Sequence, residues 1–130
     1  MPLASTLDTL AATSHAGRSS FGDFVAALAA AGVESYHADY RRKSTTFYLP
    51  DGATHTVHLP VPSVAIPEAF DGDAVVGAIR GAQAGDVSYP AFVARTMAAG
   101  CVGYHVWIAG RHVDYFGRAG QLHVEHFPTR

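Results

Sequence analysis

The feature that most constrains this chain is its similarity to itself. When the sequence is shifted by 68 residues, residues 7–60 align with residues 75–128 without a gap, and fifteen of the 54 aligned positions are identical. The identical pairs are Ala16/Ala84, Gly17/Gly85, Ser20/Ser88, Phe24/Phe92, Val25/Val93, Ala26/Ala94, Ala30/Ala98, Ala31/Ala99, Gly32/Gly100, Tyr36/Tyr104, His37/His105, Gly52/Gly120, His55/His123, His58/His126 and Pro60/Pro128. Shared low complexity does not reproduce aromatic, histidine and proline residues at one fixed offset, so we interpret the chain as an internal duplication.

Each copy has the pattern of two helices followed by three strands. In the first copy, Ser20 with Asp23 three residues later has the spacing of a capping box, and Gly32 is placed to end that helix. In the second copy we expect Asp73 to cap one helix and Ser88 to cap the next. Period-two alternation over residues 36–40 and 104–108 then indicates half-buried antiparallel strands, and Leu49-Pro50-Asp51-Gly52 is typical of a hairpin turn.

These patterns predict an α+β fold in a single domain spanning residues 1–130. The predicted organisation is a first repeat over about residues 3–60, a linker over residues 61–72 and a second repeat over about residues 73–128. One ααβββ unit is too small to cover both faces of its own elements. We therefore expect the two copies to pack with pseudo-twofold symmetry, with helices against an antiparallel sheet. The residues leave open whether the strands form one continuous sheet or two.

Composition excludes several classes of function. The formal net charge of −2 and the pI near 6.4 provide no basic face, so nucleic acid is an unlikely partner. The beginning of the chain lacks the basic segment and apolar run of a signal peptide, and no apolar stretch approaches the roughly 20 residues that span a bilayer. We therefore expect a cytoplasmic protein that does not enter a membrane. The single cysteine, Cys101, lies in an apolar stretch and is expected to be buried and unreactive.

The second copy also carries a resemblance to a known family. The segment AAGCVGYHVWIAGRHVDYFGRAGQLHVEHFP, residues 98–128, resembles the YdfO-like and YbcV-like bacterial proteins. These contain a domain of unknown function that is sometimes labelled "phage envelope protein". The resemblance runs from about Phe21 to Pro128 and is strongest from Tyr89 onward. It implies an α+β fold in a bacterial or prophage-derived protein, and it implies no activity, cofactor or catalytic residue.

Histidines supply the candidate chemistry. Six of the eight histidines fall into three pairs at the 68-residue offset, and imidazole is a common ligand for transition metals. His123 and Glu125 are two apart on a predicted strand and therefore share one face, where they could hold a divalent metal or act as a base and its orienting acid. With His105 they form the catalytic and metal candidates of a metal-binding protein or a small hydrolase-type enzyme. The alternative is a solvated strand or a structural hydrogen bond, and no cofactor is predicted.

A second candidate is a binding surface on the strand face opposite the predicted core. Trp107 and His105 alternate with the apolar residues of their strand, and Arg111 and His112 follow in the adjacent turn. Phosphate-binding loops and nucleophile elbows are absent from the sequence. We therefore favour a non-catalytic binding or interaction domain, with an unknown protein or small ligand as its partner. Packing of Trp107 in a homodimer or a second small core is the competing interpretation.

Overall fold

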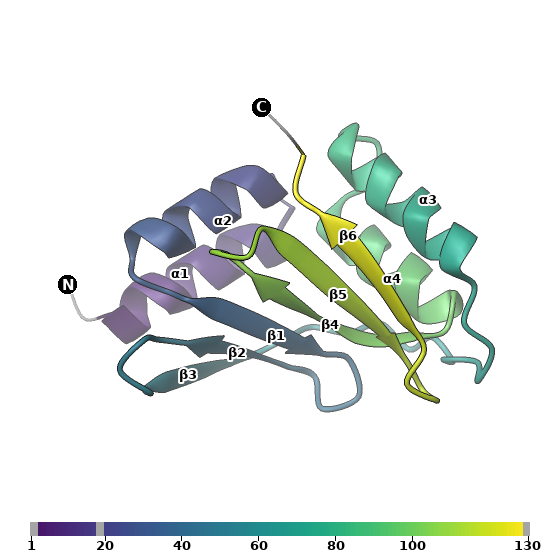
Figure 1. Ribbon diagram of the computed structural model, residues 1–130, viewed down its shortest axis with the longest axis horizontal. Helices are drawn as coiled ribbons and strands as arrows, with labels where there is room; N and C mark the ends of the chain where they lie inside the picture. The colour runs from purple at the N-terminus through teal and green to yellow at the C-terminus, as the bar shows by residue number, and fades with distance from the viewer. Residues whose placement is uncertain (1–2, 18–19, 129–130) are drawn as a thin grey trace.

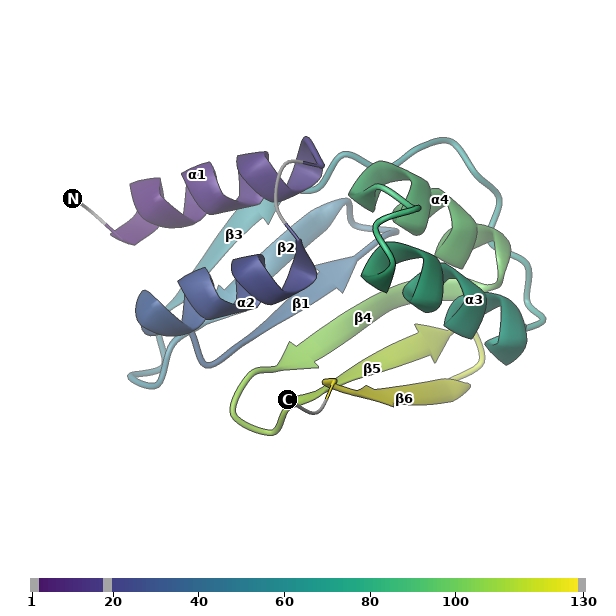
Figure 2. The same cartoon turned by 90° about the horizontal axis from the view of Figure 1, so that it is seen from above.

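The structure is a computed structural model, and it describes residues 3–17 and 20–128. Within these residues the chain forms four helices and six strands in two layers (Figures 1 and 2). The elements are α1 (Leu3–His15), α2 (Phe21–Ala30), β1 (Ser35–Asp39), β2 (Ser44–Tyr48), β3 (Thr54–His58), α3 (Gly72–Gln83), α4 (Tyr89–Ala98), β4 (Cys101–Trp107), β5 (His112–Gly117) and β6 (Leu122–His126). The α+β class is confirmed.

All six strands belong to one antiparallel sheet, which answers the question that the sequence left open. The strand order is β3-β2-β1-β4-β5-β6, so β1 and β4 pair at the centre of the sheet. In this central pair His37 lies directly opposite His105. The helix pairs α1–α2 and α3–α4 lie over the same face of the sheet, and no described helix covers the other face (Figure 2).

Local sequence explains how the helices begin. The side chains of Ser20 and Ser88 accept hydrogen bonds from the backbone N–H of Asp23 and Ala91, so both predicted caps are confirmed. The prediction for α3 was wrong by two residues: the helix begins at Gly72, and Asp71 caps it by accepting from the N–H of Ala74. Asp73 instead lies in the first turn, where its charge favours the helix dipole.

The segment before α3 is held against the end of α4 by a close backbone approach. Gly100 follows α4 with a φ of +95°, and a Cβ atom there would overlap the carbonyl oxygen of Ala69. The N–H of Asp71 donates to the carbonyl of Ala99 over 2.8 Å at the same place. Two features therefore require glycine at position 100: the positive backbone angle φ and the lack of space for a Cβ atom.

The core lies between the helix layer and the sheet. Its sheet side carries a row of four aromatic rings that crosses β2, β1, β4 and β5, made by Phe47, Tyr36, Tyr104 and Tyr115. Successive ring centroids in this aromatic row are 5.7, 6.3 and 5.5 Å apart. Cys101 is also buried as expected, and burial raises the pKa of its thiol to about 11, which keeps it protonated and unreactive.

Candidate ligand-binding cavity

A cavity of about 390 Å³ lies above the aromatic row, between the sheet and the two helix pairs. Its walls come from all four helices and from five of the six strands, and they are mostly apolar. The aromatic residues that line it are Phe21, Phe24, Tyr36, Phe47, Tyr89, Phe92, Tyr104, Tyr115 and Phe127. A volume of this size and an apolar lining with a few polar groups are characteristic of small-molecule sites.

Most of the lining residues occur in pairs separated by 68 positions. The pairs are Ala11/Ile79, Ser14/Ala82, His15/Gln83, Phe21/Tyr89, Phe24/Phe92, Tyr36/Tyr104, Thr45/Val113 and Phe47/Tyr115. The lining departs from this pairing at the end of β6, because residues 125–128 border the cavity whereas their counterparts, residues 57–60, do not. The cavity therefore lies where the two halves of the chain meet, and it extends toward β6.

Four tyrosines that border the cavity differ in how their hydroxyl groups are satisfied. The hydroxyls of Tyr89 and Tyr104 are 2.8 Å apart and form a hydrogen bond that ties α4 to β4. Tyr36 and Tyr115 are only 2% and 5% exposed, and their hydroxyls have no hydrogen-bond partner among the described residues. Burial raises the pKa of both far above its ordinary value, so each keeps its proton and is available as a donor.

The polar rim of the cavity includes His15 at the end of α1. Its ring stacks on Tyr89, with centroids 5.8 Å apart and an angle of 18° between the planes. Burial, and secondarily the charge of His58, lower the pKa of His15, so its imidazole is neutral at neutral pH. His15 therefore contributes a flat, uncharged wall rather than a positive charge.

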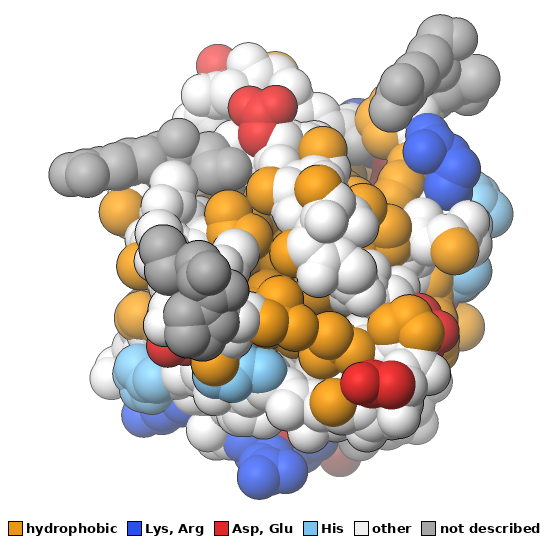
Figure 3. Space-filling view, turned by 90° about the vertical axis from the view of Figure 1, so that its left-hand side faces the viewer, with side chains coloured by type: hydrophobic (Ala, Val, Ile, Leu, Met, Phe, Trp, Pro, Cys, Tyr) orange, Lys and Arg blue, Asp and Glu red, His pale blue; other side chains and the backbone are white. Residues whose placement is uncertain are grey.

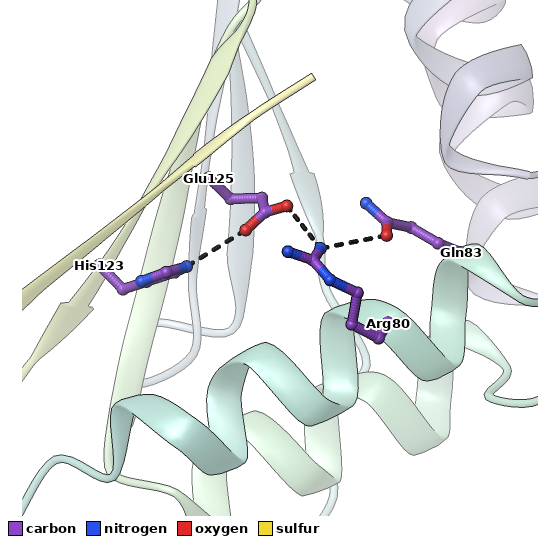
Figure 4. Close-up of polar contacts among 4 residues, drawn as sticks. All are labelled: Arg80, Gln83, His123 and Glu125. Atoms are coloured by element: carbon purple, nitrogen blue, oxygen red, sulfur yellow. Dashed lines mark hydrogen bonds and ion pairs between the residues drawn. The ribbon is translucent and has the colours of Figure 1, made fainter. Parts of the chain in front are cut away.

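Glu125 is the carboxylate on the cavity wall, and it belongs to a cluster that joins β6 to α3 (Figure 4). Its two oxygens lie 2.6 Å from Nη1 of Arg80 and 3.3 Å from Nε2 of His123, and Arg80 also donates to Gln83 over 3.1 Å. Burial raises the pKa of Glu125, but the hydrogen bonds from Arg80 and His123 outweigh burial and lower the pKa below its ordinary value. Glu125 is thus ionised with both oxygens engaged, as a structural ion pair would be.

The structure brings together only part of the predicted catalytic and metal set. His123 and Glu125 share the helix-facing side of β6, as the alternation predicted. His123 pairs with Tyr115 and Tyr115 with Tyr104, so His105, the neighbour of Tyr104, faces the opposite side of the sheet. The convergence of His105 with His123 that the enzyme interpretation requires is therefore not present. Among the described residues, no group of three or more histidine, cysteine, aspartate or glutamate side chains is arranged to hold a metal ion.

On the open face of the sheet, His105 instead meets its counterpart His37. Their Nδ1 atoms are 3.2 Å apart, so one imidazole donates to the other. Burial, and then the proximity of His37, lower the pKa of His105 to about 4, although Asp114 acts in the opposite direction. Nε2 of His105 is buried without a partner among the described residues. Both imidazoles of this central histidine pair are neutral at neutral pH, because burial lowers the pKa of His37 as well.

The predicted binding surface is assembled except for one member. Trp107 is 41% exposed, its ring lies 4.1 Å from that of His105, and its Nε1 donates to Asp114 over 3.0 Å. The ring of His112 is 6.4 Å from that of Trp107. Arg111 points elsewhere: its guanidinium lies 5.4 Å over the ring of Phe127 and donates to the carbonyl of Pro128 over 3.3 Å. Arg111 thus packs against the chain end that borders the cavity.

Sequence reasoning missed both the cavity and the central histidine pair. Several of the aromatic lining residues and the two histidines are among the repeated positions. A repeat in the sequence does not show which of the equivalent strands lie next to each other in the fold. That information comes from the pairing of β1 with β4, which places equivalent residues on either side of the sheet centre. A search for repeated aromatic pairs on the helix-facing side of the central strands is the signal that would have pointed to the cavity.

Comparison with known proteins gives relatives without an assigned activity. The chain is 39% identical over 67 residues to uncharacterized proteins of Mycobacterium tuberculosis and Mycobacterium bovis, a match that covers 52% of this chain and 41% of each relative. The chain therefore spans less than half the length of these relatives. No family model matches the sequence, so the resemblance to YdfO-like and YbcV-like proteins and the phage label have no support from a family assignment. None of the described helices is long and apolar enough to cross a membrane.

Proposed function

We propose that this chain is a non-catalytic binding domain that holds a small, largely apolar molecule in the cavity between the sheet and the two helix pairs. The observation that carries the proposal is the cavity itself, which has about 390 Å³ of space within a mostly apolar lining that is rich in aromatic rings. The carboxylate on the cavity wall is already engaged, because Glu125 is bound by Arg80 and His123. A general base must be free to take a proton from its substrate.

The proposal includes the origin of the cavity in a duplicated ααβββ unit with pseudo-twofold symmetry. Three observations support this architecture. Fifteen identities occur at one offset, and eight pairs of lining residues occur at the same offset. In addition, the strand order becomes its own reverse when β1, β2 and β3 are exchanged for β4, β5 and β6. The register of β1 and β4 adds a fourth, since the pairs Ser35/Trp107 and Asp39/Gly103 interchange when each residue is replaced by its counterpart. In this view the ligand site is shared by the two copies.

The test is a fluorescence titration with the neutral probe N-phenyl-1-naphthylamine. Ala82 lies on the cavity wall in the last turn of α3, and Ala82→Phe places a ring in the space that the probe would occupy. We expect this variant to bind the probe at least about tenfold more weakly than the natural chain. Ser14→Phe, on the equivalent position of α1, is the second filling variant and gives the same expectation if Ala82→Phe does not fold.

A control on the other face of the sheet is necessary, because apolar surface is not confined to the cavity. Tyr48, Trp107, Leu122 and Val124 are exposed. Hydrophobic side chains also gather in the middle of the side of the molecule drawn in Figure 3, which is the left-hand end of Figure 1 and not the open face of the sheet. Trp107→Ala should leave probe binding unchanged. If Trp107→Ala abolished binding and both filling variants retained it, the ligand would belong on the open sheet face and the cavity proposal would be wrong. The prediction of a homodimer through Trp107 stays a prediction.

A further inference from the structure

Two hydroxyl groups at the cavity are not used by the fold. Tyr36 and Tyr115 are at least nine-tenths buried, and neither hydroxyl has a hydrogen-bond partner among the described residues. In contrast, the hydroxyls of Tyr40 and Tyr89 are bonded to Thr96 and Tyr104 over 2.8 Å. Neither oxygen is among the described side-chain atoms that are wholly buried without a partner, so both hydroxyls reach the accessible space of the cavity. A group bound in that space can accept a hydrogen bond from either of them.

The two hydroxyls belong to one stretch of the cavity floor. The rings of Tyr36 and Tyr115 flank that of Tyr104 in the aromatic row, at centroid distances of 6.3 and 5.5 Å. Both side chains emerge on the helix-facing side of the sheet and border the cavity. A flat molecule lying on the row therefore meets donors at its edge and rings at its face, which suits the offset and edge-to-face contacts of aromatic groups.

The charges around the cavity restrict what that molecule can be. No lysine or arginine is among the described lining residues, and the carboxylate there, Glu125, already has Arg80 and His123 as partners. An anionic ligand would find no lysine or arginine among the described wall residues and would face the carboxylate of Glu125. A cationic ligand would have to compete with Arg80 for Glu125, and its N–H groups would leave the tyrosine protons unpaired.

We infer that the cavity selects a neutral, planar apolar molecule that carries a hydrogen-bond acceptor, such as a carbonyl, within reach of Tyr36 or of Tyr115. This inference rests on the proposed function, which supplies the cavity as the binding site. It adds the chemical class of the ligand: an uncharged aromatic ketone, ester or quinone-like compound rather than an aromatic acid or amine.

Four naphthalenes of similar size test the inference by displacement of N-phenyl-1-naphthylamine. The parent naphthalene reports on the cavity alone, and 2-acetylnaphthalene adds a neutral acceptor. The anionic 2-naphthoate and the cationic 2-naphthylmethylamine complete the set. We expect 2-acetylnaphthalene to bind about three- to tenfold more tightly than naphthalene, because it gains one hydrogen bond to a buried donor, and both charged compounds to bind more weakly than naphthalene.

Tyrosine variants identify the donors. Tyr36→Phe and Tyr115→Phe together should remove the advantage of 2-acetylnaphthalene and leave naphthalene binding unchanged. Each replacement removes only a hydroxyl without a partner, so the variants should remain as stable as the natural chain. Tyr48→Phe is the matched control, because Tyr48 is an exposed tyrosine outside the cavity lining, and it should alter neither affinity.

The outcomes separate the inference from the function on which it rests. If naphthalene and all three derivatives fail to bind, the proposed function is wrong. If naphthalene binds but the ketone has no advantage, or the advantage survives in Tyr36→Phe/Tyr115→Phe, the assignment of the two donors is wrong while the cavity stands. Preferential binding of 2-naphthoate or of 2-naphthylmethylamine would overturn the selection of a neutral ligand.

Discussion

At the level of single residues, the central histidine pair shows how close packing at the centre of the sheet favours uncharged side chains. His37 and His105 share one hydrogen bond, and both are partly removed from water on the open face. Burial disfavours the first proton that such a pair takes up, and a second proton would place two positive charges across a contact of 3.2 Å. The fold therefore favours the neutral forms, and the pair is a point at which acid weakens the sheet.

We predict that the free energy of unfolding decreases as the pH falls from about 7 to 5. The pKa of His105 is about 4 in the folded chain against 6.5 as its ordinary value, so the unfolded chain binds protons in this window that the folded chain excludes. The stabilisation is complete above pH 6.5 and is lost as the pH approaches 4. Urea unfolding at pH 7.5 and at pH 5.0 measures the effect through the difference between the two midpoints.

The variant His105→Gln should reduce this pH dependence, with His37 and His15 contributing the remainder because their pKa values are also lowered. His126→Gln, at the end of the edge strand β6, controls for the loss of one imidazole from the sheet. An equal pH dependence in the natural chain and in His105→Gln would contradict the role of the central pair.

At the level of elements, the start of α3 offers two neighbouring aspartates with different functions. Asp71 accepts the N–H of Ala74 over 3.0 Å and so satisfies one of the backbone donors that the first turn leaves free. Asp73 lies within the helix and acts only through its charge near the positive end of the helix dipole. Replacing each aspartate in turn therefore compares the contribution of an N-cap hydrogen bond to stability with that of a charge near the helix dipole.

We expect Asp71→Ala to lower the free energy of unfolding by about 1 kcal/mol, which is the usual contribution of an N-cap side chain. Asp73→Ala should cost less, about 0.3–0.5 kcal/mol, and its effect should diminish in high salt. The measurement is urea unfolding of both variants at low and at high salt. If Asp73→Ala lowered the free energy of unfolding more than Asp71→Ala did, Asp73 would be the N-cap, as the sequence predicted.

The elements also show what could be derived from the sequence and what could not. Local signals suffice where a structure depends on neighbours in the chain: Ser20 and Ser88 begin helices, Gly52 takes its positive φ in the turn between β2 and β3, and His123 reaches Glu125 on one strand face. Alternation along β4 also placed Trp107 away from the core.

Contacts between distant segments could not be derived in this way. Arg111 was grouped with Trp107 because the two are close in sequence, but the turn gives Arg111 a φ of +58° and its side chain lies over Phe127. His105 was grouped with His123 because both are histidines of the second copy, whereas strand register sends them to opposite faces. The cavity required knowledge of how the two helix pairs sit on the sheet, which no local pattern contains.

At the level of the whole molecule, the strand order suggests a test of the duplicated architecture. The segment between β3 and α3 joins the two halves of the chain. If the halves are related by a twofold rotation, the reverse connection, from the end of β6 to the beginning of α1, spans an equivalent distance. The chain can then be opened in this segment and closed between residues 128 and 3.

We predict that a circular permutant folds to the same structure. Its new termini lie between Pro62 and Ser63, which are both exposed, and about ten glycine and serine residues join position 128 to position 3. The expected result is a native-like circular dichroism spectrum and cooperative unfolding, with probe binding retained. A permutant with a linker of about two residues is the control, and it should fail because it cannot cover the distance. Failure of the long-linker permutant would contradict the pseudo-twofold architecture.

The paired lining of the cavity has a consequence for how a guest is oriented. Walls that repeated perfectly would accept the same molecule in two poses of equal energy, each the half-turn of the other. This chain removes that degeneracy, because six of the eight lining pairs differ in residue type. Tyr115, for example, carries a hydroxyl that its counterpart Phe47 lacks, and Glu125 stands where the first half of the chain has Val57. An asymmetric ligand should therefore bind in one pose, because the two halves of this chain line the cavity with different side chains and two identical halves could not.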